Sequence, residues 1–567
     1  MQQQDLQMPQ RMQQPEQQKR DFAKEDVVRR IQREYTSGKQ FKANLDLYEI
    51  CKQNENFYIG KHWEGLKVSA VKPMTYNFLR RIIGTAQALV VSDDIGFQIT
   101  PYLSIEEHDQ QGEIIEESLR ALIERQKIKS LNRESLHDCA VFGDSAMYFW
   151  FDPELETGQD MKGDIRAEIL MNTNIIFGNP YSREVQGQPY IILVRRRPLD
   201  VVKLEAQRNG VPDWENIQPE CEYDYMGEDK DQSGNLVTEL TRFWKVKGQD
   251  GSEKVHFMTI CGEVVTKEDT QTEMSLYPLA YWSWIDRKNC MHGISPMTEV
   301  IPTQIAINQM MTYIHTFNRN LAFPKFVFDT QKFPNGWDST PGKAIGVRGD
   351  VNQTYANVFG GISLPAGIVE IVQMMREMMQ DCMGASDASL GNVKPDNTSA
   401  IIAAQKATSA PLELQKRKFE QFNEDCIRIM VDMMCAFYGL RYVVTEQEQI
   451  DPVTGAQNKE KVLSQMDFGQ MQIGQLDINV DVGAASYWSE LMQTTTLDNL
   501  FAKQIVTDPE LFIESIPAVQ MPNKSEILRA VAEQKKQAMQ QAAQQMQMQA
   551  ANMPMPQAAE PITGVQV

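Results

Sequence analysis

Cysteine and histidine are the residues with which this sequence could most readily bind a metal or attack a substrate. They lie close together twice, as Cys290 with His292 and as His137 with Cys139. Neither pair has a second half at the spacing of a zinc finger, so we expect no metal site. The eight cysteines include no CxxC pair. We therefore expect reduced, mostly buried thiols.

A phosphate-binding loop is the next chemistry to consider, and Gly336–Ala344 comes nearest to one. The spacing between its two glycines is one residue too long, and Ala344 follows Lys343 where a serine or threonine would hold magnesium. The chain contains no GxSxG and no HExxH string, and its six histidines are scattered. We therefore predict no catalytic residue, no cofactor and no enzymatic activity, which favours a structural role.

The composition is typical of a soluble globular protein. The chain has 567 residues, of which 42% are hydrophobic and 23% charged, enough for about three to four domain-sized units. No stretch approaches the ~18 uncharged apolar residues of a membrane-spanning helix. The first residues, MQQQDLQMPQ, lack the apolar segment of a secretory signal. We expect no membrane association and an intracellular product.

The charge balance limits how the protein could meet nucleic acid. Lysine and arginine total 56 against 76 aspartates and glutamates, a net charge of −20. A protein that reads DNA sequence usually carries the opposite sign. If this protein meets DNA, we expect a repelling surface or a small local basic patch.

The first half of the sequence alternates between helical and strand-like patterns. Residues 1–20 are rich in glutamine and bury too little apolar surface to fold, so we predict a disordered tail. Residues 21–140 have mainly helical patterns, with an apolar stripe between Glu113 and Asn132. Dense aromatic residues after Gly143 predict a buried strand. Short β-favouring runs follow at 191–194, 240–246 and 255–260.

The second half begins with a long helical pattern at 296–320, where Pro296 and Pro302 suit the first turns of a helix. The segment 321–366 is rich in proline, glycine and asparagine and predicts a compact β or irregular module. A second helix is predicted at 367–383.

A stretch of small residues, 384–398, separates this second helix from a third, and it cannot be helical throughout. The third helix is predicted over 399–438, with a kink or a break at Pro411. Strands are predicted over 440–482 and helices over 489–534. Residues 535–567 are a second tail rich in glutamine and methionine, partly helical and then disordered.

In this order, several strings of the sequence resemble the portal (head–tail connector) proteins of tailed bacteriophages. The strings lie along nearly the whole chain between the two tails, and their order makes the match more specific than any one of them. They are NENFYIGKHWEG (Asn54–Gly65), KPMTYNFLRRIIGT (Lys72–Thr85), VFGDSAMYFWFDP (Val141–Pro153), YWSWIDRKNCMHGISPMTEVIPTQIAINQM (Tyr281–Met310), GASDASLGNVKPDNTSAIIAAQKAT (Gly384–Thr408) and NVDVGAASYWSE (Asn479–Glu490).

The resemblance implies an α+β fold, mainly α, in which wing, stem, clip and crown form a ring around a central DNA channel. The ring would be a closed homo-oligomer of roughly twelve copies. By position, the parts would be the wing (21–295 and 439–488, with a spine helix at 399–438), two stem helices (296–320 and 367–383), the clip (321–366), a tunnel loop (384–398) and the crown (489–534).

The resemblance also implies roles for three sets of residues. The tunnel loop would face DNA through Ser386, Ser389, Asn392, Lys394 and Asn397. The clip would meet partner proteins through Lys325, Lys332, Lys343 and Arg348. The apolar stripe of the spine helix would serve oligomer and core packing through Phe419, Phe422, Met430, Met433 and Phe437.

The implied partners are double-stranded DNA, read without sequence specificity, the major capsid protein, the terminase motor, and head–tail adaptor or tail proteins. The protein would be made in the cytoplasm of a bacterial host and would reside at the portal vertex of the virion. Two alternatives stay open at this point. One is an enzyme of DNA packaging, such as a terminase-like ATPase or nuclease, and the other is a different multimeric structural protein of the virion.

Overall fold

A computed structural model of the chain divides into two compact units, residues 1–482 and 483–567. All the residues that the structure describes lie in the first unit. They are 16–64, 73–91, 95–101, 106–157, 161–219, 235–248, 251–320, 325–328, 330–331, 348, 350, 356–359, 366–383, 412–450, 457–470 and 476–482. Several predicted parts therefore lie outside the described residues. They are the crown (489–534), the tunnel loop (384–398), residues 1–15 of the first tail and all of the second tail (535–567).

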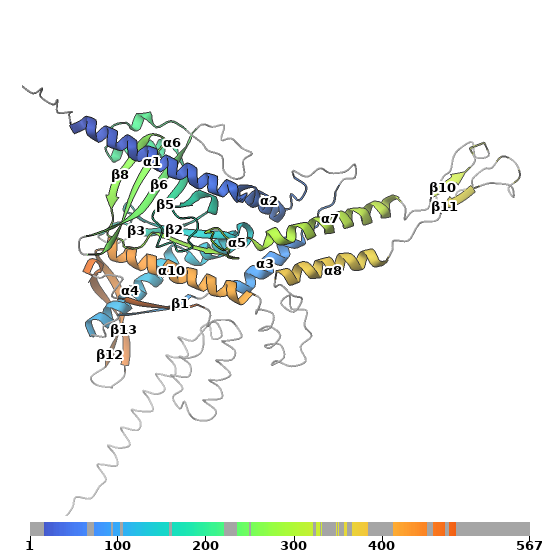
Figure 1. Ribbon diagram of the computed structural model, residues 1–567. Helices are drawn as coiled ribbons and strands as arrows, with labels where there is room; N and C mark the ends of the chain where they lie inside the picture. Colours follow the sequence, from blue (N-terminus) through green and yellow to red (C-terminus); the bar gives the residue numbers. More distant parts are fainter. Residues whose placement is uncertain are drawn as a thin grey trace, which may run out of the picture. The chain divides into compact units, whose positions relative to one another are not determined.

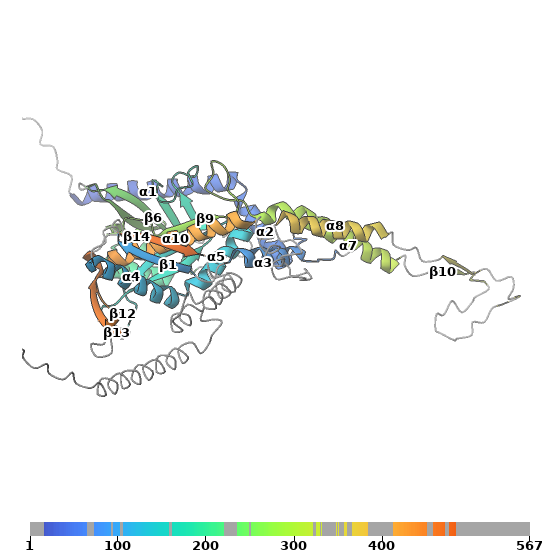
Figure 2. The ribbon, with the colours of Figure 1, turned by 90° about the horizontal axis from the view of Figure 1, so that it is seen from below.

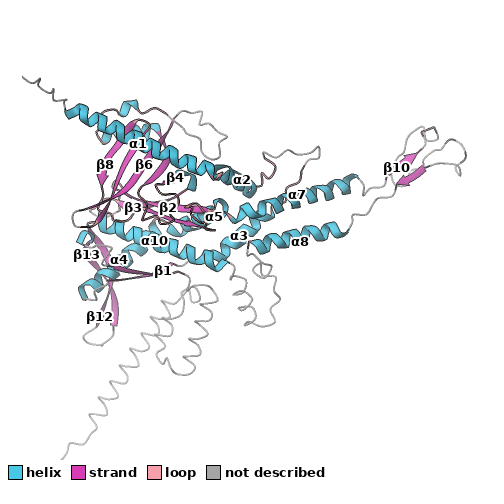
Figure 3. Ribbon diagram, in the orientation of Figure 1, coloured by secondary structure: helices cyan, strands magenta, loops and turns pink. Residues whose placement is uncertain are grey.

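Two antiparallel sheets organise the first unit (Figures 1 and 3). The smaller has the strand order β3-β2-β9 and contains the aromatic run predicted as a buried strand. Its strands are β2 (Asp144–Asp152), β3 (Asp164–Leu170) and β9 (Leu279–Ser283). The larger has the order β4-β5-β6-β7-β8, and its strands are β4 (Ile175–Phe177), β5 (Ile191–Pro198), β6 (Leu236–Lys247), β7 (Glu253–Cys261) and β8 (Val264–Gln271).

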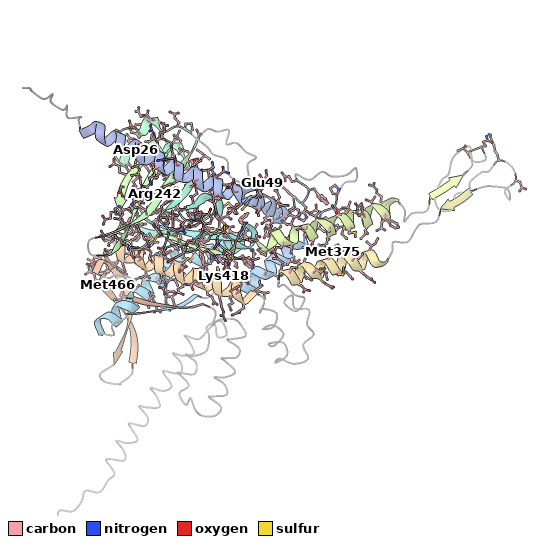
Figure 4. All side chains as sticks on the ribbon, viewed as in Figure 1. Asp26, Glu49, Arg242, Met375, Lys418 and Met466 are labelled. Carbon is pink, nitrogen blue, oxygen red and sulfur yellow. The ribbon has the colours of Figure 1, made fainter. Side chains whose placement is uncertain are left out.

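Helix α1 (Glu16–Asn44) lies across the five-stranded sheet (Figure 1). Val28 and Ile31 are buried against that sheet, and Arg242 of β6 donates to Glu34 of α1 at 2.7 Å. Figure 4 labels Arg242. The helix begins at Glu16, so residues 16–20 are not part of a disordered tail as predicted. The reason is local: the run from Glu16 to Lys24 consists largely of residues with good helix propensity.

Five further helices and one strand complete the part before the long helices. They are α2 (Leu47–Ile59), α3 (Phe78–Val90), α4 (Glu106–Arg125), α5 (Ile128–Phe142), α6 (Leu199–Arg208) and β1 (Ile95–Pro101). The strand interrupts the segment predicted as mainly helical. It pairs with β14 (Leu476–Val482), from the other end of this unit, and a partner so distant in sequence leaves no local pattern to detect.

Helix α7 (Pro296–Asn320) and helix α8 (Ala366–Cys382) lie side by side (Figures 1 and 2). Their bounds agree with the two predicted helices at 296–320 and 367–383. Between them in sequence, β10 (Lys325–Phe328) pairs with β11 (Ala356–Phe359) in an antiparallel ladder. This short pairing is the described part of the compact module predicted there.

Helix α10 (Glu413–Phe437) packs against the three-stranded sheet, with its aromatic side chains on Trp282 of β9. Its described residues begin just after Pro411, where a kink or a break was predicted. Strands β12 (Leu440–Ile450) and β13 (Gln457–Asp467) then form a long antiparallel hairpin. Together with β14 they confirm the strands predicted over 440–482.

Candidate functional site: the helix pair α7–α8 and its anchorage

Helix α7 is anchored in the core at its first half and is uncharged over most of its length. Met297, Val300, Ile301 and Ile307 are buried. Pro302 lies in the second turn, close enough to the helix start for its missing amide to be tolerated. No charged residue lies between Glu299 and His315. A helix with so few charges suits a position between other parts of the protein rather than in open solvent.

A ladder of polar side chains holds α7 to the segment 73–79. Gln304, Asn308 and Thr312 follow one another at intervals of one helical turn, and all three are buried. Thr312 accepts from the Met74 amide at 3.0 Å and Asn308 from the Tyr76 amide at 3.1 Å. Gln304 accepts from the Leu79 amide at 3.1 Å and donates to the Tyr76 carbonyl at 2.6 Å. The ladder fixes which face of α7 turns inward.

His62 completes this ladder as a neutral side chain. Its Nε2 lies 2.9 Å from the Phe57 carbonyl oxygen, which only accepts, so Nε2 carries the proton. Its Nδ1, 2.7 Å from Asn308 Nδ2, is then the acceptor. Burial lowers the pKa of His62, which agrees with a neutral ring. This histidine is therefore a structural partner of α7.

Asp144 lies where α7 leaves the sheets. The side chain is buried and accepts from His292 Nδ1 at 2.8 Å, from the Gly293 amide at 3.3 Å, and from Tyr281 and Asn172. Two glycines let these segments approach. Gly143 has a φ of 101°, and a Cβ on Gly293 would lie 2.6 Å from the Gly143 oxygen. The turn before α7 is thus tied to the start of β2.

Lys42 extends this polar cluster to α1. Its side chain is buried, and its ammonium donates to the carbonyls of Asn172 and Thr173, each at 2.9 Å, and of Ile175. Burial lowers the pKa of Lys42 to about 7, while the nearby Asp144 opposes that shift. Three carbonyl acceptors favour the charged ammonium. The cluster joins α1, β2 and the start of α7.

Helix α8 has one face in the core and leaves an apolar stripe uncovered. Val372 and Met375 pack against the core, and Met379 and Met383 are buried. Figure 4 labels Met375 on this helix. On another face, Ile371, Met374 and Met378 are 37%, 53% and 57% exposed. Their spacing of three and four places them in one line. Beside this line, the exposed Glu370, Glu377 and Asp381 form an acidic flank.

The structure places the predicted packing residues inside one subunit. Phe419, Phe422, Met430 and Met433 are buried, and Phe437 is partly buried and stacks on Phe151 at 5.1 Å. The rings of Phe419 and Phe422 lie 5.4 and 6.0 Å from Trp282. The subunit's own core therefore accounts for the apolar stripe, and a contribution of this stripe to ring assembly stays a prediction.

The other predicted site residues are only partly described. Lys325 begins β10, and Arg348 is exposed. Lys332 and Lys343 of the clip, and Ser386, Ser389, Asn392, Lys394 and Asn397 of the tunnel loop, lie outside the described residues. Their roles stay predictions. Sequence reasoning missed the ladder on α7 and the cluster around Asp144, although His62, Asp144 and His292 all lie within the quoted strings.

The described residues contain no group of three or more histidine, cysteine or acidic side chains that could hold a metal ion. Within the same residues, no helix is long and apolar enough to span a membrane. The histidines at the base of α7 serve as hydrogen-bonding partners of buried polar groups. In this arrangement, the paired helices α7 and α8 are anchored at one end in the hydrophobic core.

Comparison with known protein families shows to which of the protein classes considered above the chain belongs. A model of the P22-like phage portal protein family matches residues 32–562, nearly the whole chain. The chain belongs to this portal family. A search of curated proteins finds no match. The match includes both sheets, the helix pair and the segment between α7 and α8, so the resemblance noted in the sequence is confirmed.

Membership of the portal family gives the protein's class. Portal proteins are structural, non-enzymatic components of the phage virion capsid. They assemble as oligomeric rings and engage capsid and terminase partners. The α+β content expected from the sequence agrees with the described helices and sheets.

Proposed function

We propose that this chain is the subunit of a ring-shaped channel at one vertex of a tailed-phage capsid, through which double-stranded DNA is packaged and ejected. The channel docks the terminase motor during packaging and head–tail adaptor or tail proteins afterwards. The uncovered apolar stripe of α8 carries this proposal. Ile371, Met374 and Met378 are 37%, 53% and 57% exposed, and a line of exposed apolar side chains marks a protein contact.

In this ring, α7 and α8 are the stem helices. A subunit that contacts its neighbour through a heterologous surface can close into a ring, because each copy then offers two different faces. Apolar side chains that are buried between neighbouring subunits stabilise the assembled ring by about 25 cal/mol per Å² of apolar area removed from water. A few methionines per subunit, repeated around the ring, therefore add up to a large assembly energy.

The charge of the protein suits passage of DNA. The net charge is −20, and α8 carries the exposed Glu370, Glu377 and Asp381. A surface of the same sign as the phosphate backbone offers no counterion-releasing binding sites, so DNA slides without sticking. The predicted tunnel loop, with Lys394 as its one cation, supplies brief contacts in this proposal. The clip, which includes β10 and β11, is the proposed surface for motor and adaptor proteins.

The test is the native mass of the purified protein, by light scattering and electron microscopy, with a pair of matched variants. Met374→Asp places a charge in the stripe and should abolish the ring. Gln373→Asp adds the same charge on a neighbouring exposed position and should leave the ring intact. A wild-type monomer that hydrolyses ATP would contradict the proposal in favour of a packaging enzyme.

A further inference from the structure

Helix α7 also leaves one face uncovered. Pro302, Gln309 and Tyr313 are exposed, and Tyr313 is 67% exposed. Ala306 and Thr316 are half-buried and fall on the same line, because the five positions follow one another at intervals of four and three. This line contains no charged side chain, and its most prominent group is an aromatic ring.

Two other faces of α7 are occupied within the subunit between Val300 and Thr312. The ladder of Gln304, Asn308 and Thr312 faces residues 73–79. Val300, Ile301 and Ile307 are buried in the core, and Ile305 and Met311 pack against it. The line from Pro302 to Thr316 is therefore the face that α7 has left for another molecule. Since the line contains no charged group, covering it avoids the large free-energy cost of desolvating a charge.

The two uncovered lines run in opposite directions. The first half of α7 is in the core through Met297 and Val300, and the end of α8 is in the core through Met379 and Met383. The helices are thus antiparallel, as Figures 1 and 2 show. Val300 of α7 and Met383 at the end of α8 belong to the same core cluster. Counted outward from these two residues, Ala306 and Met378 are six and five residues away, Gln309 and Met374 are each nine, and Tyr313 and Ile371 are thirteen and twelve. The α8 line from Ile371 to Met378 and the part of the α7 line from Ala306 to Tyr313 each span about 10 Å, at about 1.5 Å per residue.

We propose that the stripe of α8 packs on the Pro302–Thr316 face of α7 in the next copy of the chain, with Ile371 against Tyr313 and Met378 against Ala306. This pairing rests on the ring of the proposed function. Rotation about a ring axis keeps each residue at its height along that axis, so groups at one level meet groups at the same level. An apolar stripe then meets an uncharged face, and Tyr313 supplies a large, stiff anchor of the kind enriched at interfaces.

Disulfide trapping between two different subunits tests this pairing. Both subunits carry Cys382→Ser, because Cys382 is an exposed thiol on α8. One carries Tyr313→Cys and the other Ile371→Cys, and the two are mixed before assembly and then oxidised. We expect a covalent dimer from the mixture and none from the Cys382→Ser parent. Because each subunit has only one new cysteine, a bond within one chain cannot produce this dimer.

The matched control replaces Ile371→Cys by Gln373→Cys, which lies at nearly the same level on another face of α8. A dimer of equal yield from this control would overturn the pairing, as would rings that form without any Tyr313–Ile371 dimer. In either case the ring, and with it the proposed function, would stand. Absence of a ring from the wild-type protein would overturn both.

If the cysteine variants do not assemble, a second measurement with alanine variants tests the same pairing. Tyr313→Ala and Ile371→Ala should each lower the temperature at which the ring dissociates. If the side chains touch, the double variant should lower it by no more than the larger single effect, since removal of either partner removes the contact. Strictly additive shifts would overturn the pairing.

Discussion

Two regions of this subunit differ in how their side chains are satisfied: polar groups around Asp144 are buried, whereas apolar side chains on α8 are exposed. The buried carboxylate of Asp144 is matched by hydrogen bonds from three other segments of the chain, at Asn172, Tyr281 and His292–Gly293. On α8, apolar side chains such as Met374 and Met378 stay more than half exposed. The first carboxylate has its partners within one chain, whereas the second set of side chains stays open to solvent in the described part of the subunit.

The difference separates folding from assembly. Substitutions around Asp144 or Trp282 should lower the stability of the single subunit, because they disturb contacts within it. Substitutions in the α8 stripe should leave that stability unchanged and act on the ring. The ladder of Gln304, Asn308 and Thr312 is also complete within the subunit, and it fixes the face of α7 that is presented outward. Each of the following changes tests one side of this separation.

The largest effect is expected from Phe422→Asp in α10. The side chain is 1% exposed and lies against Trp282, so the variant buries an unpaired charge and removes an aromatic contact. We expect a loss of about 4 kcal/mol or more in the free energy of unfolding. Urea unfolding followed by circular dichroism measures it. Leu414→Asp, at a position 61% exposed on the same helix, is the control and should change stability by less than about 0.5 kcal/mol.

The next effect concerns Asp144, and the protein contains its own control. Asp144 and Asp269 each lie 2.8 Å from a histidine Nδ1, but the first carboxylate is 0% exposed and the second 52%. Asp144→Ala leaves several buried donors unpaired, and we expect a loss of about 3–5 kcal/mol. Asp269→Ala should cost less than about 1 kcal/mol. Equal losses, measured by thermal unfolding, would refute the central role of the buried cluster.

The helix pair and the strands of the larger sheet could be predicted because their signals are local. The pattern around Pro296 and Pro302 marks the start of α7, and the bounds of the helix follow from it. Likewise, the β-favouring runs at 191–194, 240–246 and 255–260 lie inside β5, β6 and β7. Family membership could also be predicted, since the quoted strings lie along nearly the whole chain.

The site could be predicted only in part, because its key contacts join distant segments. Asp144 meets His292 across a long stretch of chain, and Asn308 meets His62 across a longer one. A buried aspartate or asparagine looks the same in sequence as an exposed one. The stripe from Phe419 to Phe437 shows the same limit. Its spacing predicts an apolar face, but only the structure shows that Trp282 of the same subunit covers that face.

A moderate effect is expected from Asn308→Leu in the ladder on α7. The variant leaves the Tyr76 amide and His62 Nδ1 without the partners they have now, which should cost about 1–3 kcal/mol. Gln309→Leu, the adjacent exposed position, should be neutral for the subunit. Hydrogen exchange of α7 in monomeric subunits measures both variants. Faster exchange in the Gln309 variant than in the Asn308 variant would contradict the assigned orientation of α7.

The smallest effect, and the only stabilising one, concerns Asp138 on α5. Unlike Asp144, this carboxyl has acidic neighbours, Glu134 and Glu55. Burial, Glu134 and Glu55 together raise the pKa of Asp138 to about 7. The folded state therefore holds a proton that the unfolded state releases near pH 4, and stability falls as pH rises from about 4 to 7. Asp138→Asn removes this penalty. Because the Asp138 side chain is only half-buried, solvent screens its charge, and we expect the free energy of unfolding to rise by about 1 kcal/mol at pH 8, which is less than the pKa shift taken at face value would give. The gain should vanish at pH 4, where the carboxyl is protonated in both states. Urea unfolding of both proteins across this pH range measures it, and a gain that persists at pH 4 would mean that the amide stabilises through a new hydrogen bond instead.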